Sequence, residues 1–189
     1  MTARCLLLRL RRDRSGIAAT EFALVLPLLV ALWLGMAQLI QLSMASAKTS
    51  LAAQSVADLV SRYTSSGYAD PSGFSDLEAA ADTIIAPLPT SADNPSISIV
   101  SVTLNASGSA TQAWHCTSGN NQPTAQQLAA AIAQAPGLTT SSSSLTSMII
   151  VTVIYSYTPT ITGGVLGPQT FVTSAYGTPR TVSTVPNPC

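Results

Sequence analysis

Residues 22–37 have the sequence FALVLPLLVALWLGMA, sixteen consecutive residues without a polar side chain. The apolar stretch continues to Ile40 if Gln38 is accepted, and three further apolar residues, 17–19, lie shortly before it. Together they reach the roughly 20 residues that a helix needs to cross a bilayer. A buried core helix is the alternative, but the stretch is apolar on every side. We therefore expect a single transmembrane helix over residues 17–40.

Charge is distributed unevenly along the chain. Residues 1–16 carry five arginines against one aspartate, a net charge of +4, whereas residues 17–189 carry a net charge of −4. Beyond the apolar stretch, the first charged residue is Lys48. The positive-inside rule therefore predicts a cytoplasmic N-terminus and places residues 43–189 on the other side of the membrane.

The composition excludes several classes of protein. Only 8% of the residues are charged, against about 25% in an average soluble domain, while 47% are hydrophobic and the mean hydropathy is +0.36. This profile excludes a highly charged disordered chain. Eight lysines and arginines cannot form a basic surface for nucleic acid, so no nucleic-acid partner is expected.

No motif predicts an enzyme. The sequence lacks a G-x-S-x-G nucleophile elbow, a P-loop and a dinucleotide-binding glycine motif. His115 is the sole histidine, and with its neighbour Cys116 it cannot form a tetrahedral metal site. We expect no catalytic residue, no metal and no cofactor.

Glu21 is a carboxylate at the edge of the predicted span. Such a group costs about 2.5 kcal/mol or more if it moves to the centre of a bilayer. Glu21 could simply lie among the headgroups, or favour the first turn of the helix through the helix dipole. It also follows Gly16, where the basic segment ends, by five residues. A cut between Gly16 and Ile17 would create an amino group with which Glu21 could pair.

The stretch from residue 14 to 27, RSGIAATEFALVLP, resembles the start of TadE-like proteins, the pseudopilins of the tight adherence (Flp) pilus system. The shared features are a basic leader ending in Gly16, the Glu21-Phe22 pair and an early Pro27. Near the C-terminus, Thr178-Pro179-Arg180 and Cys189 weakly resemble the arginine-proline-arginine run and late cysteine of many members.

The resemblance implies a function. A prepilin peptidase would cleave between Gly16 and Ile17, with Glu21 and Phe22 as recognition residues for processing and assembly. The chain would be a minor pilin-like subunit in the biogenesis of an adhesive Tad pilus. It would lie in the inner membrane, or be associated with the pilus. Its partners would be other pilin and pseudopilin subunits and the Tad inner-membrane machinery.

The exported part is expected to have an α+β fold. The helix is predicted to continue over residues 41–63 with Asp58 and Arg62 paired one turn apart, and Pro27 is expected to bend it. Residues 64–189 should form a pilin-like domain, in which a small antiparallel sheet packs on the long helix. The predicted elements are a loop at 64–75, a short helix capped by Ser75 and Glu78 and ended by Pro87, a second capped by Thr124 and Gln127, and strands at 96–104, 108–116, 147–157 and 170–176.

Cys116 and Cys189 are the two cysteines beyond the anchor, since Cys5 lies in the basic leader. The predicted topology places both outside the cytoplasm, where disulfides persist. We expect them to pair within one chain, although two free thiols or a bond between subunits would also be consistent with the sequence.

Two other functions are open. The chain could be an uncleaved bitopic membrane protein whose outer domain binds a partner. Alternatively, cleavage after Ala47, in the Ala45-Ser46-Ala47 tripeptide, would release a secreted soluble protein. The N-terminal residue of the mature chain distinguishes all three functions.

Overall fold

The computed structural model describes most of the chain outside its N-terminal segment and several connections. The described residues are 15–62, 72–91, 94–104, 110–119, 123–134, 147–159, 167–180, 184–187 and 189. Most of the predicted leader and the predicted loop up to residue 71 lie outside these ranges.

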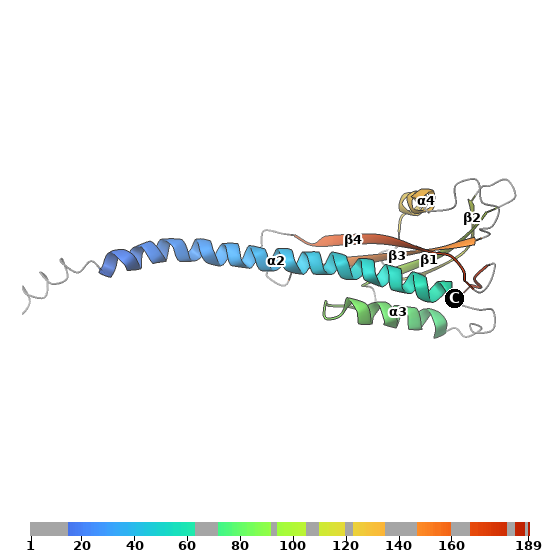
Figure 1. Cartoon of the computed structure of the whole chain (residues 1–189), viewed down its shortest axis with the longest axis horizontal. Coiled ribbons are helices and arrows are strands. Elements are labelled where there is room, and N and C mark those ends of the chain that lie inside the picture. Colours follow the sequence, from blue (N-terminus) through green and yellow to red (C-terminus); the bar gives the residue numbers. More distant parts are fainter. Residues whose placement is uncertain are drawn as a thin grey trace, which may run out of the picture. The chain divides into compact units, whose positions relative to one another are not determined.

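Helix α2 runs without interruption from Ser15 to Ser61 (Figure 1). Its 47 residues correspond to a length of about 70 Å. The sequence predicts this helix over residues 17–63, and Tyr63 lies outside the described part. The residues of α2 up to Gln41 and those from Leu42 onward belong to two separate compact units, and the second unit contains the sheet.

Four antiparallel strands form the sheet, in the order β2-β1-β3-β4. Their bounds are Ser96–Leu104 for β1, Ala110–Ser118 for β2, Ser147–Tyr157 for β3 and Gln169–Gly177 for β4. Together with the long helix, this sheet confirms the predicted α+β class. β2 begins and ends two residues later than predicted, because it pairs with β1 in a register that joins Ile97 to Ser118.

The interior strand β3 has the predicted bounds, and all but one of its residues are buried. Its near-continuous apolar sequence is typical of a strand covered on both faces. On one face, residues of β1 and β3 join α2 and α3 (Ser72–Ile85) in the main core around Tyr155. On the other face, Val100, Val102, Met148 and Ile150 form a smaller core with Ile132 of α4 (Ala125–Gln134).

The two short helices test the predicted caps. At α4 the capping box is confirmed: Thr124 N–H donates to Gln127 Oε1 at 2.9 Å, and Gln127 N–H donates to Thr124 Oγ1 at 3.3 Å. At α3 the prediction is wrong, because the helix begins at Ser72 and Ser75 lies inside it. Phe74 packs against the main core, so burial of this side chain extends the helix by a turn. The helix ends before Pro87, as predicted.

Candidate functional site

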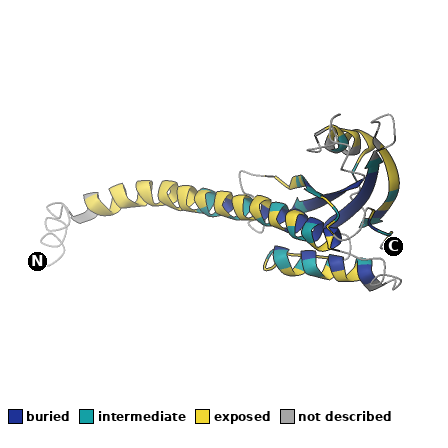
Figure 2. Cartoon of the chain, turned by 45° about the vertical axis from the view of Figure 1, so that its right-hand side comes forward, coloured by how far each residue is buried: buried dark blue, intermediate teal, exposed yellow. Residues whose placement is uncertain are grey.

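The N-terminal half of α2 is exposed on every side. Every residue from Ala18 to Trp33 is exposed, as Figure 2 shows by the unbroken yellow of this segment. The most exposed large apolar side chains are Leu24 at 79%, Leu28 at 69% and Trp33 at 68%. A soluble core helix needs only an apolar stripe, whereas residues 22–33 are apolar all round. α2 is long and apolar enough to cross a membrane.

The predicted processing residues lie at the start of this helix. Gly16 and Ile17 are in the first turn of α2, and the structure does not describe their side chains. Glu21 and Phe22, on the following turns, are exposed, Phe22 by 61%. Among the described side chains, the ion pairs involve Asp58 and not Glu21. Glu21 and Phe22 are therefore accessible to another molecule, while cleavage after Gly16 stays a prediction.

Two further positions in the apolar segment differ from their surroundings. Pro27 lies inside α2, where it removes a backbone donor and leaves the carbonyl of Ala23 without its helical hydrogen bond. The predicted bend at Pro27 stays a prediction.

Gln38 is only 4% exposed, and its Nε2 has no hydrogen-bond partner in the structure. An amide in this position costs free energy that an apolar residue would not.

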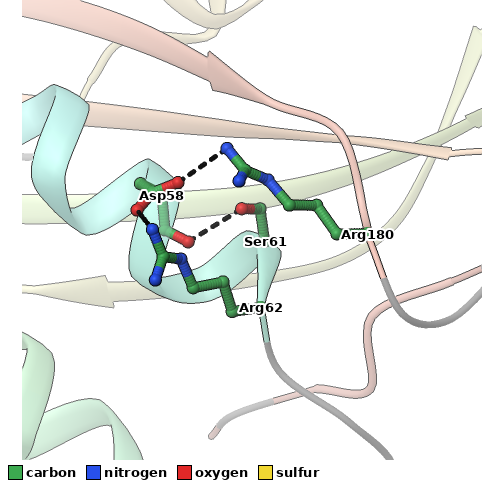
Figure 3. Close-up of polar contacts among 4 residues, drawn as sticks. All are labelled: Asp58, Ser61, Arg62 and Arg180. Atoms are coloured by element: carbon green, nitrogen blue, oxygen red, sulfur yellow. Dashed lines mark hydrogen bonds and ion pairs between the residues drawn. The ribbon is translucent and has the colours of Figure 1, made fainter.

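A cluster of charges lies at the other end of α2 (Figure 3). The Asp58 carboxylate contacts Arg62 at 2.5 Å and Arg180 at 2.8 Å, using a different oxygen for each guanidinium. Arg62 is the predicted partner one turn away. Arg180, 122 residues along the chain from Asp58, comes from the segment that follows β4 and was not predicted as a partner. The one signal in the sequence that singled out Arg180 was the resemblance of Thr178-Pro179-Arg180 to the family pattern.

The same residues also provide hydrogen bonds for backbone carbonyls at the C-terminus of α2. The backbone N–H of Arg180 donates to the Ser61 carbonyl at 3.0 Å, and the backbone N–H of Arg62 donates to the Leu59 carbonyl at 3.1 Å. The Ser61 hydroxyl donates to the Asp58 carbonyl at 2.7 Å. These bonds occupy carbonyls that have no partner within a helix at its end. The ion pairs themselves are about 60% exposed on the arginine side, so each contributes at most about 1 kcal/mol.

Beside this cluster is an open hollow of about 490 Å³ between the C-terminal part of α2 and the end of β4. Its lining is about equally polar and apolar and includes Gln54, Asp58, Ser174, Tyr176 and Arg180. Gly177 brings the two elements together at this point. A Cβ on Gly177 would lie 2.9 Å from the Ala57 carbonyl oxygen, closer than such atoms approach in proteins. A side chain at this position would therefore push β4 away from α2.

Lys48 joins α2 to α3. Its Nζ donates to the Ile84 carbonyl at 3.0 Å and also contacts the Ala86 carbonyl, so a cation lies at the C-terminus of α3. Two acids lie within α3. Burial raises the pKa of Glu78, with a smaller contribution from the charge of Asp82, and burial also raises the pKa of Asp82.

The C-terminal tail is attached to β2 at two points. The sulfur atoms of Cys116 and Cys189 lie at disulfide distance, and the Cα atoms are 6.0 Å apart. The Trp114 indole N–H donates to the Val185 carbonyl at 2.8 Å, and Val185 is buried in the main core. Within the described residues, no group of three or more His, Cys, Asp and Glu side chains could hold a metal ion.

Most of helix α2 matches the model of a known protein family. Residues 16–58 match the family model of TadE-like proteins. The resemblance that the sequence indicates is thereby confirmed, and it relates the chain to the Tad pilus system. This TadE-like segment begins at Gly16 and ends at Asp58, so it covers α2 almost to its end. No curated protein and no solved structure matches the chain.

Proposed function

We propose that this chain is a minor pilin-like subunit that takes part in assembly of a Tad pilus. The observation that carries the proposal is the match of residues 16–58 to TadE-like proteins, which begins at the predicted processing glycine. The uniformly apolar and exposed stretch 22–33 supports it, because such a helix needs lipid or neighbouring helices around it. The role is structural rather than enzymatic.

The chain would be processed first and assembled second. A prepilin peptidase removes the basic leader between Gly16 and Ile17 while α2 spans the inner membrane, with residues 43–189 outside the cytoplasm. Pilus machinery then brings the subunit together with other pilins and pseudopilins. The charge of Glu21 acts in the second stage, by pairing with the new amino group of Ile17 on its own or a neighbouring subunit.

Glu21→Gln separates these two stages, because it keeps the size of the side chain and removes its charge. We expect the variant to be processed like the wild type but to fail in supporting piliation when it is the sole copy. Gly16→Leu is the matched variant for the first stage and should accumulate as the full-length precursor, because a peptidase site shaped for glycine excludes a side chain. Normal piliation by Glu21→Gln would contradict the proposed role of the charge.

The two alternatives make different use of the structure. An uncleaved bitopic protein would keep Met1 and use the exported unit alone to bind its partner. A cut after Ala47 would have to occur within the continuous helix α2, between the buried residues Ala45 and Thr49. It would also remove the helical turn before Lys48, which holds the end of α3. These features favour the anchored subunit over the secreted protein.

A further inference from the structure

The C-terminal tail, residues 178–189, joins the two edges of the sheet; its residues 178–180, 184–187 and 189 are described. It leaves β4 after Gly177 and ends at Cys189, whose sulfur lies at disulfide distance from that of Cys116 in β2. β4 and β2 are the two outer strands of the sheet. Val185, between the two ends of the tail, is buried in the main core with residues of α2. The tail therefore passes on the face of the sheet that α2 covers.

The first attachment of the tail is the last turn of α2. The backbone N–H of Arg180 donates to the carbonyl of the buried Ser61 at 3.0 Å, and the Arg180 guanidinium pairs with Asp58 at 2.8 Å (Figure 3). The bond to Ser61 occupies a carbonyl that has no partner within the helix. The beginning of the tail thus holds the end of α2 through both backbone and side chain.

The second attachment is β2, and it depends on few noncovalent contacts. The Trp114 indole N–H donates to the Val185 carbonyl at 2.8 Å, and the Val185 side chain is buried. The described residues 184–187 and 189 belong to no helix or strand, so no ladder of backbone hydrogen bonds supports them. One buried valine and one hydrogen bond return less free energy than the ordering of five residues costs. The covalent bond between Cys116 and Cys189 supplies the remainder.

We propose that the tail is a strap that closes only when Cys116 and Cys189 are oxidised, and that the closed strap holds the last turn of α2 in place. Closure forms one S–S bond. The two thiols lose two protons and two electrons, and the disulfide of a thiol–disulfide exchange oxidant takes them up and becomes two thiols. Cys189 is exposed and Cys116 is buried, so a reductant reaches the bond at the Cys189 sulfur.

The strap links the packing of the exported unit to the compartment that contains it. The cytoplasm keeps thiols reduced, whereas disulfides persist outside it. On the predicted topology, closure therefore follows export of residues 43–189, and the end of α2 is fixed only then. The coupling is reciprocal by linkage: if the disulfide holds the end of α2, the contacts at the end of α2 also favour the disulfide.

Hydrogen exchange of the full-length chain with Cys5→Ser in detergent tests the first direction of the coupling. Reduction by excess glutathione should speed amide exchange at residues 58–61, the end of α2, by roughly fivefold or more. Residues 83–85, the end of α3, serve as the control because Lys48 rather than the tail contacts the carbonyls there. Unchanged exchange at residues 58–61, or equal acceleration at both helix ends, would overturn the strap.

A matched pair of variants tests the reverse direction. Asp58→Asn removes the ion pair with Arg180, whereas Asp82→Asn makes the same change on α3 at a carboxylate that pairs with no cation among the described residues. Each chain is equilibrated with mixtures of reduced and oxidised glutathione, and thiol labelling gives the disulfide fraction. We expect Asp58→Asn to shift the equilibrium toward the thiols by roughly fivefold and Asp82→Asn to leave it unchanged. Amide protection in β3 verifies that each variant is folded, and equal equilibria in the two folded variants would overturn the coupling.

These outcomes are independent of the proposed pilin-like function. A chain that begins at Ile17 but shows no coupling between the disulfide and the end of α2 refutes the strap and leaves processing in place. A chain that keeps Met1 and shows the coupling refutes processing, while the strap stands.

Discussion

Gly177→Ala tests the closest approach between the sheet and α2. The new methyl group would lie 2.9 Å from the Ala57 carbonyl oxygen, 3.4 Å from Ser61 Cβ and 3.5 Å from the Ala57 carbonyl carbon. The first contact involves the backbone at the buried residue Ala57, so no flexible side chain can move away. β4 must shift by a few tenths of an ångström, and overpacking of this kind costs about 1–3 kcal/mol. We expect the free energy of unfolding to fall by this amount.

The assay is denaturant unfolding of the full-length protein in detergent, followed by Trp114 fluorescence with Trp33→Phe in every variant. Trp114 reports on the exported unit because its indole bonds to the Val185 carbonyl. Gly167→Ala is the control, since a Cβ at Gly167 meets nothing within 4 Å. The control should be within about 1 kcal/mol of the parent. Equal stability of the two alanine variants would refute the close approach of β4 to α2.

Three further changes have defined outcomes. Cys189→Ser opens a loop with a sequence separation of 73 and should lower the free energy of unfolding by about 2–4 kcal/mol, with the parent falling to the same value under reducing conditions. Because burial raises the pKa of Glu78, the folded chain holds this proton to higher pH than the unfolded chain. The protonated Glu78 therefore stabilises the folded chain below pH 4.5, its ordinary pKa, and this contribution is lost as the pH rises through the raised pKa of the folded chain. Glu78→Gln cannot lose a proton, so its unfolding temperature should fall less than that of the parent as the pH rises from 4.5 through the raised pKa. Lys48→Met removes the cation at the end of α3 and should speed amide hydrogen exchange at residues 83–85 without changing exchange in β3. Equal exchange rates at residues 83–85 in the parent and in Lys48→Met would contradict the role of Lys48.

Sequence predicted the elements whose signal is local. The apolar stretch of α2 and the continuous β-branched sequence of β3 are strong over their whole lengths, and their bounds agree with prediction to within two residues. The Thr124–Gln127 cap was also predictable, because a capping box consists of residues three apart. The start of α3 was not predictable, because Ser72 and Gly73 are residues typical of a loop. The structure shows why they are helical: Phe74 packs against the main core.

Contacts between residues far apart in the sequence could not be predicted from local sequence patterns. Asp58 and Arg62 are one helical turn apart, so their pairing follows from spacing alone. The pairing of Asp58 with Arg180 depends on the register of β4 and on the position of its last residue, Gly177, against Ala57. The pairing of Cys116 with Cys189 was expected without geometry, because the predicted topology places these two cysteines together outside the cytoplasm, although a bond between subunits was also consistent with the sequence.

The first residue of the mature chain tests the central claim most directly. The full-length gene, expressed in its host with the pilus machinery, should yield a membrane protein whose N-terminal peptide begins at Ile17 by mass spectrometry. The Gly16→Leu variant should retain the leader under the same conditions. A wild-type chain that still begins at Met1, or one that begins at Lys48, would contradict the account of a processed pilin-like subunit.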